Sequence, residues 1–222
     1  MNNSARETIL ESVRSHLATS APYDQQEVLL DHENLVVNLV NPVKLTSDIT
    51  PAELFKQSLE AVDGHCLIVH GDDGIVQALN QIVSGQHLAI SDNPEVERLL
   101  QLTDLEIEEL GIAPDAHDIF RFDVGISTVQ AAIAETGTLV LDSTRERHRM
   151  LSLVPPIHVA IVRASQIYRT LAEVLTIIQK DKEISPAVTF ITGPSRTADI
   201  ELTLAIGVHG PQQLYVIVDE VN

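Results

Sequence analysis

Short apolar segments rich in β-branched residues alternate with amphipathic segments along most of this chain. Each apolar segment is three to six residues long, which suits a buried strand better than a helix. We predict strands at 35–40, 66–69, 88–90, 138–141, 157–162, 187–191 and 214–218, and an extended segment at 117–124. Strands that alternate with helices are joined by crossovers and run parallel. The pattern therefore predicts an α/β fold with a mostly parallel sheet and helices on both of its faces.

The segments between these strands carry apolar residues at helical spacing. Thr50 and Glu53 form the pattern of a capping box, with Pro51 at the first helical position and Gly64 as the stop. We predict helices at 4–17, 51–63, 75–83, 94–110, 126–134, 167–179 and 198–206. The acidic run at 104–109 is most simply the solvated face of its helix.

The charge balance and the cysteine content limit the kind of protein. The 222 residues include 14 basic and 32 acidic side chains, a net charge of −18, whereas nucleic-acid binders need clustered Lys and Arg. Cys66 is the only cysteine, so the chain can form no internal disulfide and cannot by itself hold a cysteine-ligated iron–sulfur cluster. The N-terminus lacks a signal pattern, and no apolar run reaches membrane-spanning length. We therefore predict a cytoplasmic protein without membrane insertion.

The segment 187–211 combines a predicted strand, a Thr-Gly-Pro-Ser turn at 192–195 and the predicted helix at 198–206. The first turn of a helix has unpaired N–H groups and a partial positive charge, which favour an anion. We therefore place Gly193, Ser195 and Arg196 in a candidate anion site. Two interpretations of Arg196 remain open: an ion pair with Asp199 that also shapes the site, or contact with an anionic ligand or internal carboxylate.

Two other segments are candidates to meet this turn at the carboxyl ends of the strands, where open α/β sheets bind ligands. One is the turn of Glu135, Thr136, Gly137 and Thr138, where a partly desolvated carboxylate would suit a catalytic base or nucleophile. The alternative is that Glu135 caps a turn or pairs with Arg196 or Arg149.

The other segment, 145–149, is the only basic cluster in the sequence. In an extended conformation Arg145, Arg147 and Arg149 share one face, and a pair of them suits a carboxylate or phosphate. The alternative is a surface loop or a contact with an acidic partner. His209 lies in a glycine-flanked turn and is a candidate acid or base, with a loop-stabilising hydrogen bond as the alternative. Histidine spacing for zinc, nucleotide-binding glycine patterns and a Gly-x-Ser-x-Gly elbow are all missing, so we expect no metal and no motif-bound cofactor.

Four of these segments together resemble the LUD-domain (lactate-utilisation) family. They are Ala-Glu-Thr-Gly-Thr-Leu-Val-Leu at 134–141, Leu-Val-Pro-Pro-Ile-His-Val-Ala at 153–160, Thr-Gly-Pro-Ser-Arg-Thr-Ala-Asp-Ile-Glu at 192–201 and Gly-Val-His-Gly-Pro at 207–211. The resemblance is clear from about residue 122 to 218 and collinear before that. It implies a three-layer, Rossmann-like domain of the NagB/RpiA/CoA-transferase type over 26–222, preceded by a helix and linker over 1–25.

The resemblance also implies a function. It points to a subunit of a bacterial lactate-utilisation system. Such systems oxidise L-lactate to pyruvate, and companion proteins hold their iron–sulfur clusters. With one cysteine, this chain would be the subunit without a cluster, and it would bind a small anion or shape the complex. One alternative is a stand-alone acyl- or CoA-transferase-like enzyme, because in CoA transferases of similar fold a glutamate before a glycine forms the acyl-enzyme, and that glutamate would be Glu135. Another is a scaffold with a degenerate site.

Overall fold

The structure is a computed structural model that describes residues 3–19, 49–90, 93–103, 105, 107–109, 118–143, 149–180, 187–200, 203–206 and 210–221. The chain divides into two compact units, Met1–Leu45 and Thr46–Asn222, and we describe each by itself. The first unit contains helix α1 (Asn3–Thr19), which confirms the helix predicted at 4–17. The strand predicted at 35–40 lies outside the described residues.

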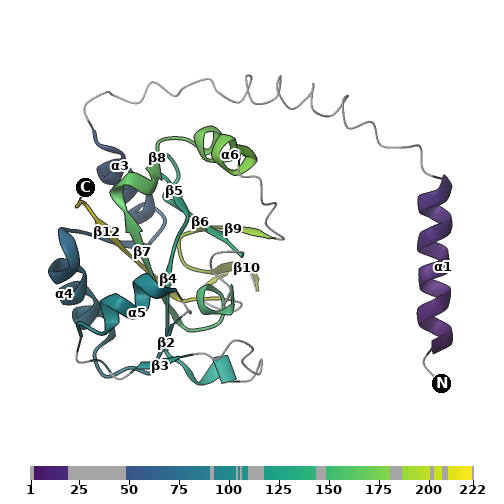
Figure 1. Ribbon diagram of the computed structural model, residues 1–222, viewed down its shortest axis with the longest axis horizontal. Coiled ribbons are helices and arrows are strands. Elements are labelled where there is room, and N and C mark those ends of the chain that lie inside the picture. Colours follow the sequence, from purple (N-terminus) through teal and green to yellow (C-terminus); the bar gives the residue numbers. More distant parts are fainter. Residues whose placement is uncertain are drawn as a thin grey trace. The chain divides into compact units, whose positions relative to one another are not determined.

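A six-stranded sheet in which every pair of neighbours is parallel forms the centre of the second unit (Figure 1). Its strands, in spatial order, are β1 (His65–Val69), β12 (Gln213–Asp219), β7 (Ile157–Arg163), β4 (Val124–Thr128), β2 (Leu88–Ile90) and β3 (Ile107–Glu109). The middle strands are almost entirely buried because both faces of the sheet are covered. The predicted α/β class with a mostly parallel sheet is confirmed.

Two helices cover one face of this sheet. Helix α4 (Gly71–Val83) and helix α5 (Pro94–Leu100) pack their apolar sides on residues of β2, β4, β7 and β12. The start of α4 is fixed by the end of β12, because the backbone N–H of Gly71 donates to Asp219 Oδ1 at 2.8 Å. This contact satisfies one of the N–H groups that the first turn of a helix leaves unpaired.

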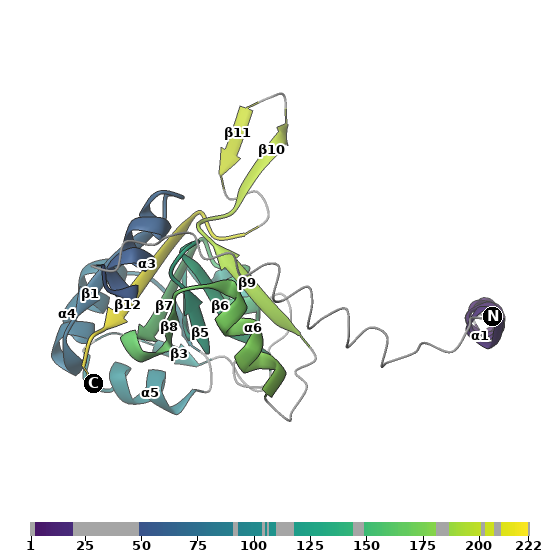
Figure 2. The same ribbon diagram turned by 90° about the horizontal axis from the view of Figure 1, so that it is seen from above.

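Strands as well as helices cover the opposite face of the central sheet, where we expected helices alone. A second sheet lies there, with strands β8 (Ile167–Tyr168), β5 (Ala131–Ile133), β6 (Thr138–Asp142) and β9 (Val188–Thr192) in that order. Helix α3 (Pro51–Glu60) lies in the same layer as the second sheet. Residues of α3 and of the second sheet form one hydrophobic core with β1, β7 and β12. Helix α6 (Leu171–Lys180) packs on the outer side of the second sheet (Figure 2).

Four of the predicted helices are wrong in whole or in part. The helix predicted at 167–179 begins only at Leu171, after strand β8. The segment 126–134 contributes instead to strands β4 and β5 and crosses from one sheet to the other. The segment 198–206 belongs to an antiparallel hairpin of β10 (Arg196–Ile200) and β11 (Thr203–Ile206) (Figure 2). The helix predicted at 94–110 stops at Leu100, and the acidic run ends in strand β3. The segment predicted as extended at 117–124 contains instead a 3₁₀ turn at Asp118–Arg121 (η1). Other short 3₁₀ turns form at Arg149–Ser152 (η2) and Ala164–Gln166 (η3).

The capping box predicted at the start of α3 is present. Thr50 Oγ1 accepts from the N–H of Glu53 at 3.2 Å, and Glu53 Oε2 accepts from the N–H of Thr50 at 3.0 Å. We expect Thr50→Ala to lower the free energy of unfolding by about 1 kcal/mol, a typical cost of losing a cap, and Thr50→Ser to lower it by less than half as much. Urea denaturation of the two variants measures the difference, and equal losses would contradict a role for the hydroxyl.

Candidate active site between the two sheets

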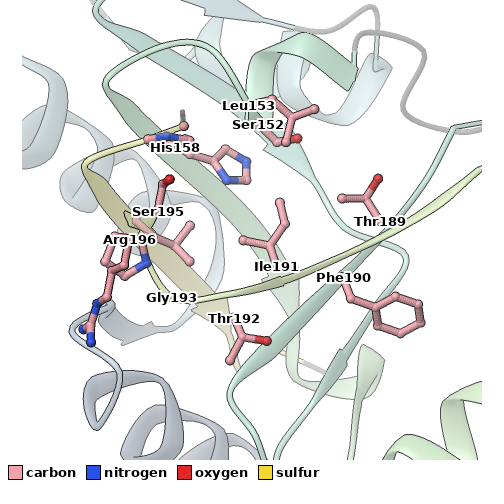
Figure 3. Close-up of a pocket in the computed structure, with 14 residues that line it drawn as sticks. Ser152, Leu153, His158, Thr189, Phe190, Ile191, Thr192, Gly193, Ser195 and Arg196 are labelled. Carbon is pink, nitrogen blue, oxygen red and sulfur yellow. The ribbon is translucent and has the colours of Figure 1, made fainter. Parts of the chain in front are cut away.

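A cavity of about 350 Å³ lies where the second sheet meets the central sheet (Figure 3). Its volume is in the range of roughly 300–1,000 Å³ that is usual for small-molecule sites. Four parts of the chain form its walls: the end of η2 with the next residue, the first part of β7, strand β9 with the turn after it, and the segment that enters β12. Segments separated by long stretches of sequence therefore meet at one hollow.

This cavity lies at the opposite edge of the sheet from the one that we expected. Its lining residues His158 and Leu214 are each the second residue of their strands, β7 and β12. The cavity therefore borders the amino ends of these parallel strands, and not their carboxyl ends. The second sheet explains the change, because β9 covers the central sheet at that edge and creates a wall that a helix-only layer would lack.

The pairing of β9 decides which of its side chains enter the cavity. Ile191 pairs with Leu139, and Thr189 pairs with Leu141; both leucines face the core shared with the central sheet. Since side chains alternate along a strand, Thr189 and Ile191 point toward the cavity, whereas Phe190 and Thr192 point away from it (Figure 3). The cavity wall formed by β9 is thus part hydroxyl and part hydrocarbon.

The histidine at the base of the cavity has one satisfied and one unsatisfied nitrogen. His158 Nε2 lies 2.9 Å from Ser127 Oγ, and both side chains are buried. The other nitrogen, Nδ1, is buried and has no hydrogen-bond partner within the described part of the chain. Burial lowers the pKa of His158 to about 4, so the ring is neutral at pH 7. Buried polar atoms nearly always have a partner, and an unpartnered nitrogen at a cavity marks a place for a ligand atom or an ordered water.

The Gly193–Arg196 turn lines the cavity, but Arg196 is directed elsewhere. The Arg196 guanidinium forms an ion pair with Asp63 and donates to the carbonyl of Val62 at 2.8 Å. Both partners directly follow α3, and Figure 3 shows the side chain turned toward that loop. The carboxylate partner in the structure is thus Asp63, whereas the predicted partner, Asp199, has a side chain outside the described part of the chain. The helix N-terminus that we expected to bind an anion is replaced by strand β10.

Gly193 fixes the turn itself. Its φ is +74°, and a Cβ at this position would lie 2.6 Å from the carbonyl oxygen of Val62. The turn therefore needs a glycine both for its backbone conformation and for its approach to the end of α3. Ser195 is held by a hydrogen bond from its N–H to the carbonyl of Pro211 at 2.8 Å, which ties the turn to the segment that enters β12.

The Glu135–Thr138 turn adjoins the Gly193 turn but does not line the cavity. The Thr138 hydroxyl lies 2.7 Å from the hydroxyls of both Thr136 and Thr192. Because Thr138 pairs with Thr192, this row of hydroxyls is on the side of the second sheet away from the cavity. The Glu135 carboxylate accepts from the N–H of Leu171 at 2.8 Å and so caps the start of α6.

The remaining candidate residues lie wholly or partly outside the described part of the chain. Arg145 and His209 lie outside the described residues. The backbone of Arg149 begins η2, the element whose last residue, Ser152, lines the cavity. Over the described ranges, no group of three or more His, Cys, Asp or Glu side chains could hold a metal ion. Within the same ranges, no helix combines the length and hydrophobicity needed to cross a bilayer.

Sequence reasoning missed His158 as a site residue because it considered this histidine only as a possible zinc ligand. A signal was present: a histidine that interrupts an apolar strand, inside the segment 153–160 that carries the family resemblance. Its functional character depends on Ser127 and the cavity, which lie on other strands.

Comparison with known proteins agrees with the resemblance. The family described as "LUD domain" matches residues 116–218. Lactate utilization protein C of Macrococcus caseolyticus is 32% identical over 203 residues, which cover 80% of this chain and 83% of that protein. The protein of the same name from Oceanobacillus iheyensis is 26% identical over 222 residues, covering 84% and 95%. Other alignments are shorter: that with lactate utilization protein C of Bacillus licheniformis spans 43% of the relative.

A crystal structure of a DUF162 family protein from Deinococcus radiodurans has the same fold. It superposes with a TM-score of 0.58 at 23% identity and covers 77% of this chain and 98% of that chain. The long alignment with the Macrococcus protein, the domain match and the shared fold lead to one conclusion. This chain belongs to the LUD-domain family.

Proposed function

We propose that this chain is a component without an iron–sulfur cluster in a system that uses L-lactate, and that its cavity binds a small carboxylate. The relatives named lactate utilization protein C support the system. The cavity carries the binding proposal, because three of the four segments of the family resemblance, at 153–160, 192–201 and 207–211, contribute residues to its wall. Hydroxyls, an imidazole and apolar side chains together suit a small polar molecule.

The cysteine content supports the absence of a cluster. Iron–sulfur clusters are bound by thiolates, commonly four of them. Cys66 is the only cysteine in the sequence, it is buried in the core of the second unit, and burial raises the pKa of its thiol to about 12. Electron transfer from lactate would therefore need partner proteins that hold the clusters, and we propose such iron–sulfur proteins as its partners.

The placement of Glu135 gives no support to a CoA-transferase-like reaction. Its carboxylate is engaged with the backbone of α6, on the far side of the second sheet from the cavity. A nucleophile needs access to a site that holds the acyl group. We therefore do not carry the transferase forward as a second function.

Growth and co-purification test the proposal. Deleting the gene from its host should abolish growth on L-lactate and leave growth on pyruvate unchanged, and the affinity-tagged chain should retrieve proteins that contain iron and acid-labile sulfide. The variant Lys180→Ala, at an exposed position at the end of α6 and outside the cavity, serves as a complementation control and should restore growth. Normal growth of the deletion strain on L-lactate would contradict the proposal.

A further inference from the structure

We infer that His158 Nδ1 contacts the 2-oxygen of the bound carboxylate, so that the cavity selects 2-hydroxy and 2-oxo acids over simple carboxylates. This inference rests on the proposed function, because it assumes that a small carboxylate occupies the cavity. It goes beyond that function by naming the ligand atom, the 2-oxygen, by which the cavity would distinguish one carboxylate from another.

The geometry of the ring supports this contact. The imidazole of His158 points into the space framed by Ser152, Ser195 and Ile191 (Figure 3). Ser127 Oγ forms a hydrogen bond with His158 Nε2 at 2.9 Å, so Nδ1 is the nitrogen without a partner in the described structure. Since Nδ1 is itself buried, a ligand reaches it only when seated at the base of the cavity, after a small adjustment of the neighbouring side chains.

The lining of the cavity favours a polar contact with a neutral ring. Arg196 is the one charged side chain among the residues that line the cavity in the described structure, and it is paired with Asp63. The ring of His158 is neutral at pH 7 because it is buried. A neutral imidazole distinguishes between ligands mainly by hydrogen bonding. A ligand that lacks the matching oxygen leaves Nδ1 buried and unpaired.

Ser127 lets the same nitrogen serve both oxidation states of the ligand. A hydroxyl can donate or accept. When Ser127 donates to Nε2, the proton of the ring is on Nδ1, which can donate to the 2-oxo oxygen of a keto acid. When Nε2–H donates to Ser127 Oγ, Nδ1 is an acceptor for the 2-hydroxyl of a hydroxy acid. The pair therefore fits L-lactate and pyruvate equally, and in this account Ser127 is a positioning residue.

Calorimetric titration with L-lactate, pyruvate and propionate tests this inference, because propionate is lactate without its 2-oxygen. We expect the protein to bind L-lactate and pyruvate at least about tenfold more tightly than propionate, the size of effect that one buried hydrogen bond produces. Equal affinities for all three acids would overturn the inference and leave carboxylate binding in place. Failure of all three acids to bind would overturn both the inference and the carboxylate site of the proposed function.

Two substitutions separate the two ring nitrogens. The amide of an asparagine occupies nearly the position of Nδ1, whereas the longer glutamine places its amide near Nε2. We expect His158→Asn to retain most of the preference for lactate over propionate, and His158→Gln to lose it about tenfold while its affinity for propionate changes less than threefold. The exposed His70 supplies a control, His70→Gln, which should behave as the unchanged protein. A His158→Gln variant with the full preference would contradict the inference.

A measurement on the unchanged protein covers the case in which these variants do not fold. The ¹⁵N resonance of His158 Nδ1, assigned in histidine-labelled protein, should shift on adding pyruvate and stay in place on adding propionate. Identical shifts with both acids, or none with either, would overturn the contact.

Discussion

Gly137→Ala is expected to lower the free energy of unfolding by about 3–4 kcal/mol. The φ of Gly137 is +63°, which costs an alanine roughly 1–2 kcal/mol. A Cβ at this position would also collide with the backbone of α3, at 2.6 Å from the Cα of the fully buried Leu59. Crowding of this kind costs a further 1–3 kcal/mol, roughly. The loss should be visible in urea denaturation as a lower midpoint with an unchanged slope.

Gly85→Ala is the matched control for this prediction. Gly85 has a similar φ of +75°, but a Cβ there would meet nothing within 4 Å. We expect this variant to lose only about 1–2 kcal/mol, the backbone cost alone. If the two variants lost the same stability, the close approach of the β5–β6 turn to α3 would be wrong. Since the Gly193 turn also packs against the end of α3, the docking of the second sheet would then need revision.

Between pH 6.5 and pH 4 the protein is expected to lose about 3 kcal/mol of stability through His158 alone. The pKa of the buried ring is lowered from 6.5 to about 4, so over this range the unfolded chain binds a proton that the folded chain does not. Stability therefore falls as the pH is lowered through 6.5, and the effect levels off below about 4; each pKa unit of difference corresponds to about 1.4 kcal/mol.

Urea denaturation at several pH values measures this contribution by difference. His158→Asn removes the titrating group, and its stability should fall less steeply than that of the unchanged protein between pH 6.5 and 4. His70→Gln removes a histidine that is 75% exposed and should leave the pH dependence as it was. Parallel curves for the protein and its His158→Asn variant would show that the ring is not held neutral by burial.

Much of the central sheet could be predicted from the sequence, because its strands are short apolar runs bounded by turn residues. β7 and β12 are examples: both are buried on two faces, and their short length and β-branched residues identify them as strands. The class of fold follows from the alternation of strands and helices. The second sheet could not be predicted in this way, because its pairings join β6 with β9 across many residues, and local patterns do not specify such partners.

The hairpin of β10 and β11 shows how a pattern can fit two periods. Residues 198, 200, 202, 204 and 206 are all apolar, which is the alternation of a strand, yet several of them also share a helical face. The helical interpretation was wrong because period two accounts for every apolar residue of the segment except Ala205. The Thr and Ile residues of the segment further favour a strand.

The candidate site was predicted in part. The Gly193–Arg196 turn lines the cavity as a site segment, whereas Arg196 binds Asp63, 133 residues away in the sequence. Neither this pairing nor the contact between Ser127 and His158 has a local signal, because each joins residues from different elements. Sequence patterns located the segments, and only the fold shows which side chains face the cavity.

The most direct test of the account is a crystal structure of the protein with pyruvate bound. We predict pyruvate in the cavity between the two sheets, with its 2-oxo oxygen within hydrogen-bond distance of His158 Nδ1 and its methyl group toward Ile191 or Leu153. Pyruvate bound outside this cavity, for example beside Glu135, with the cavity itself empty, would contradict the account.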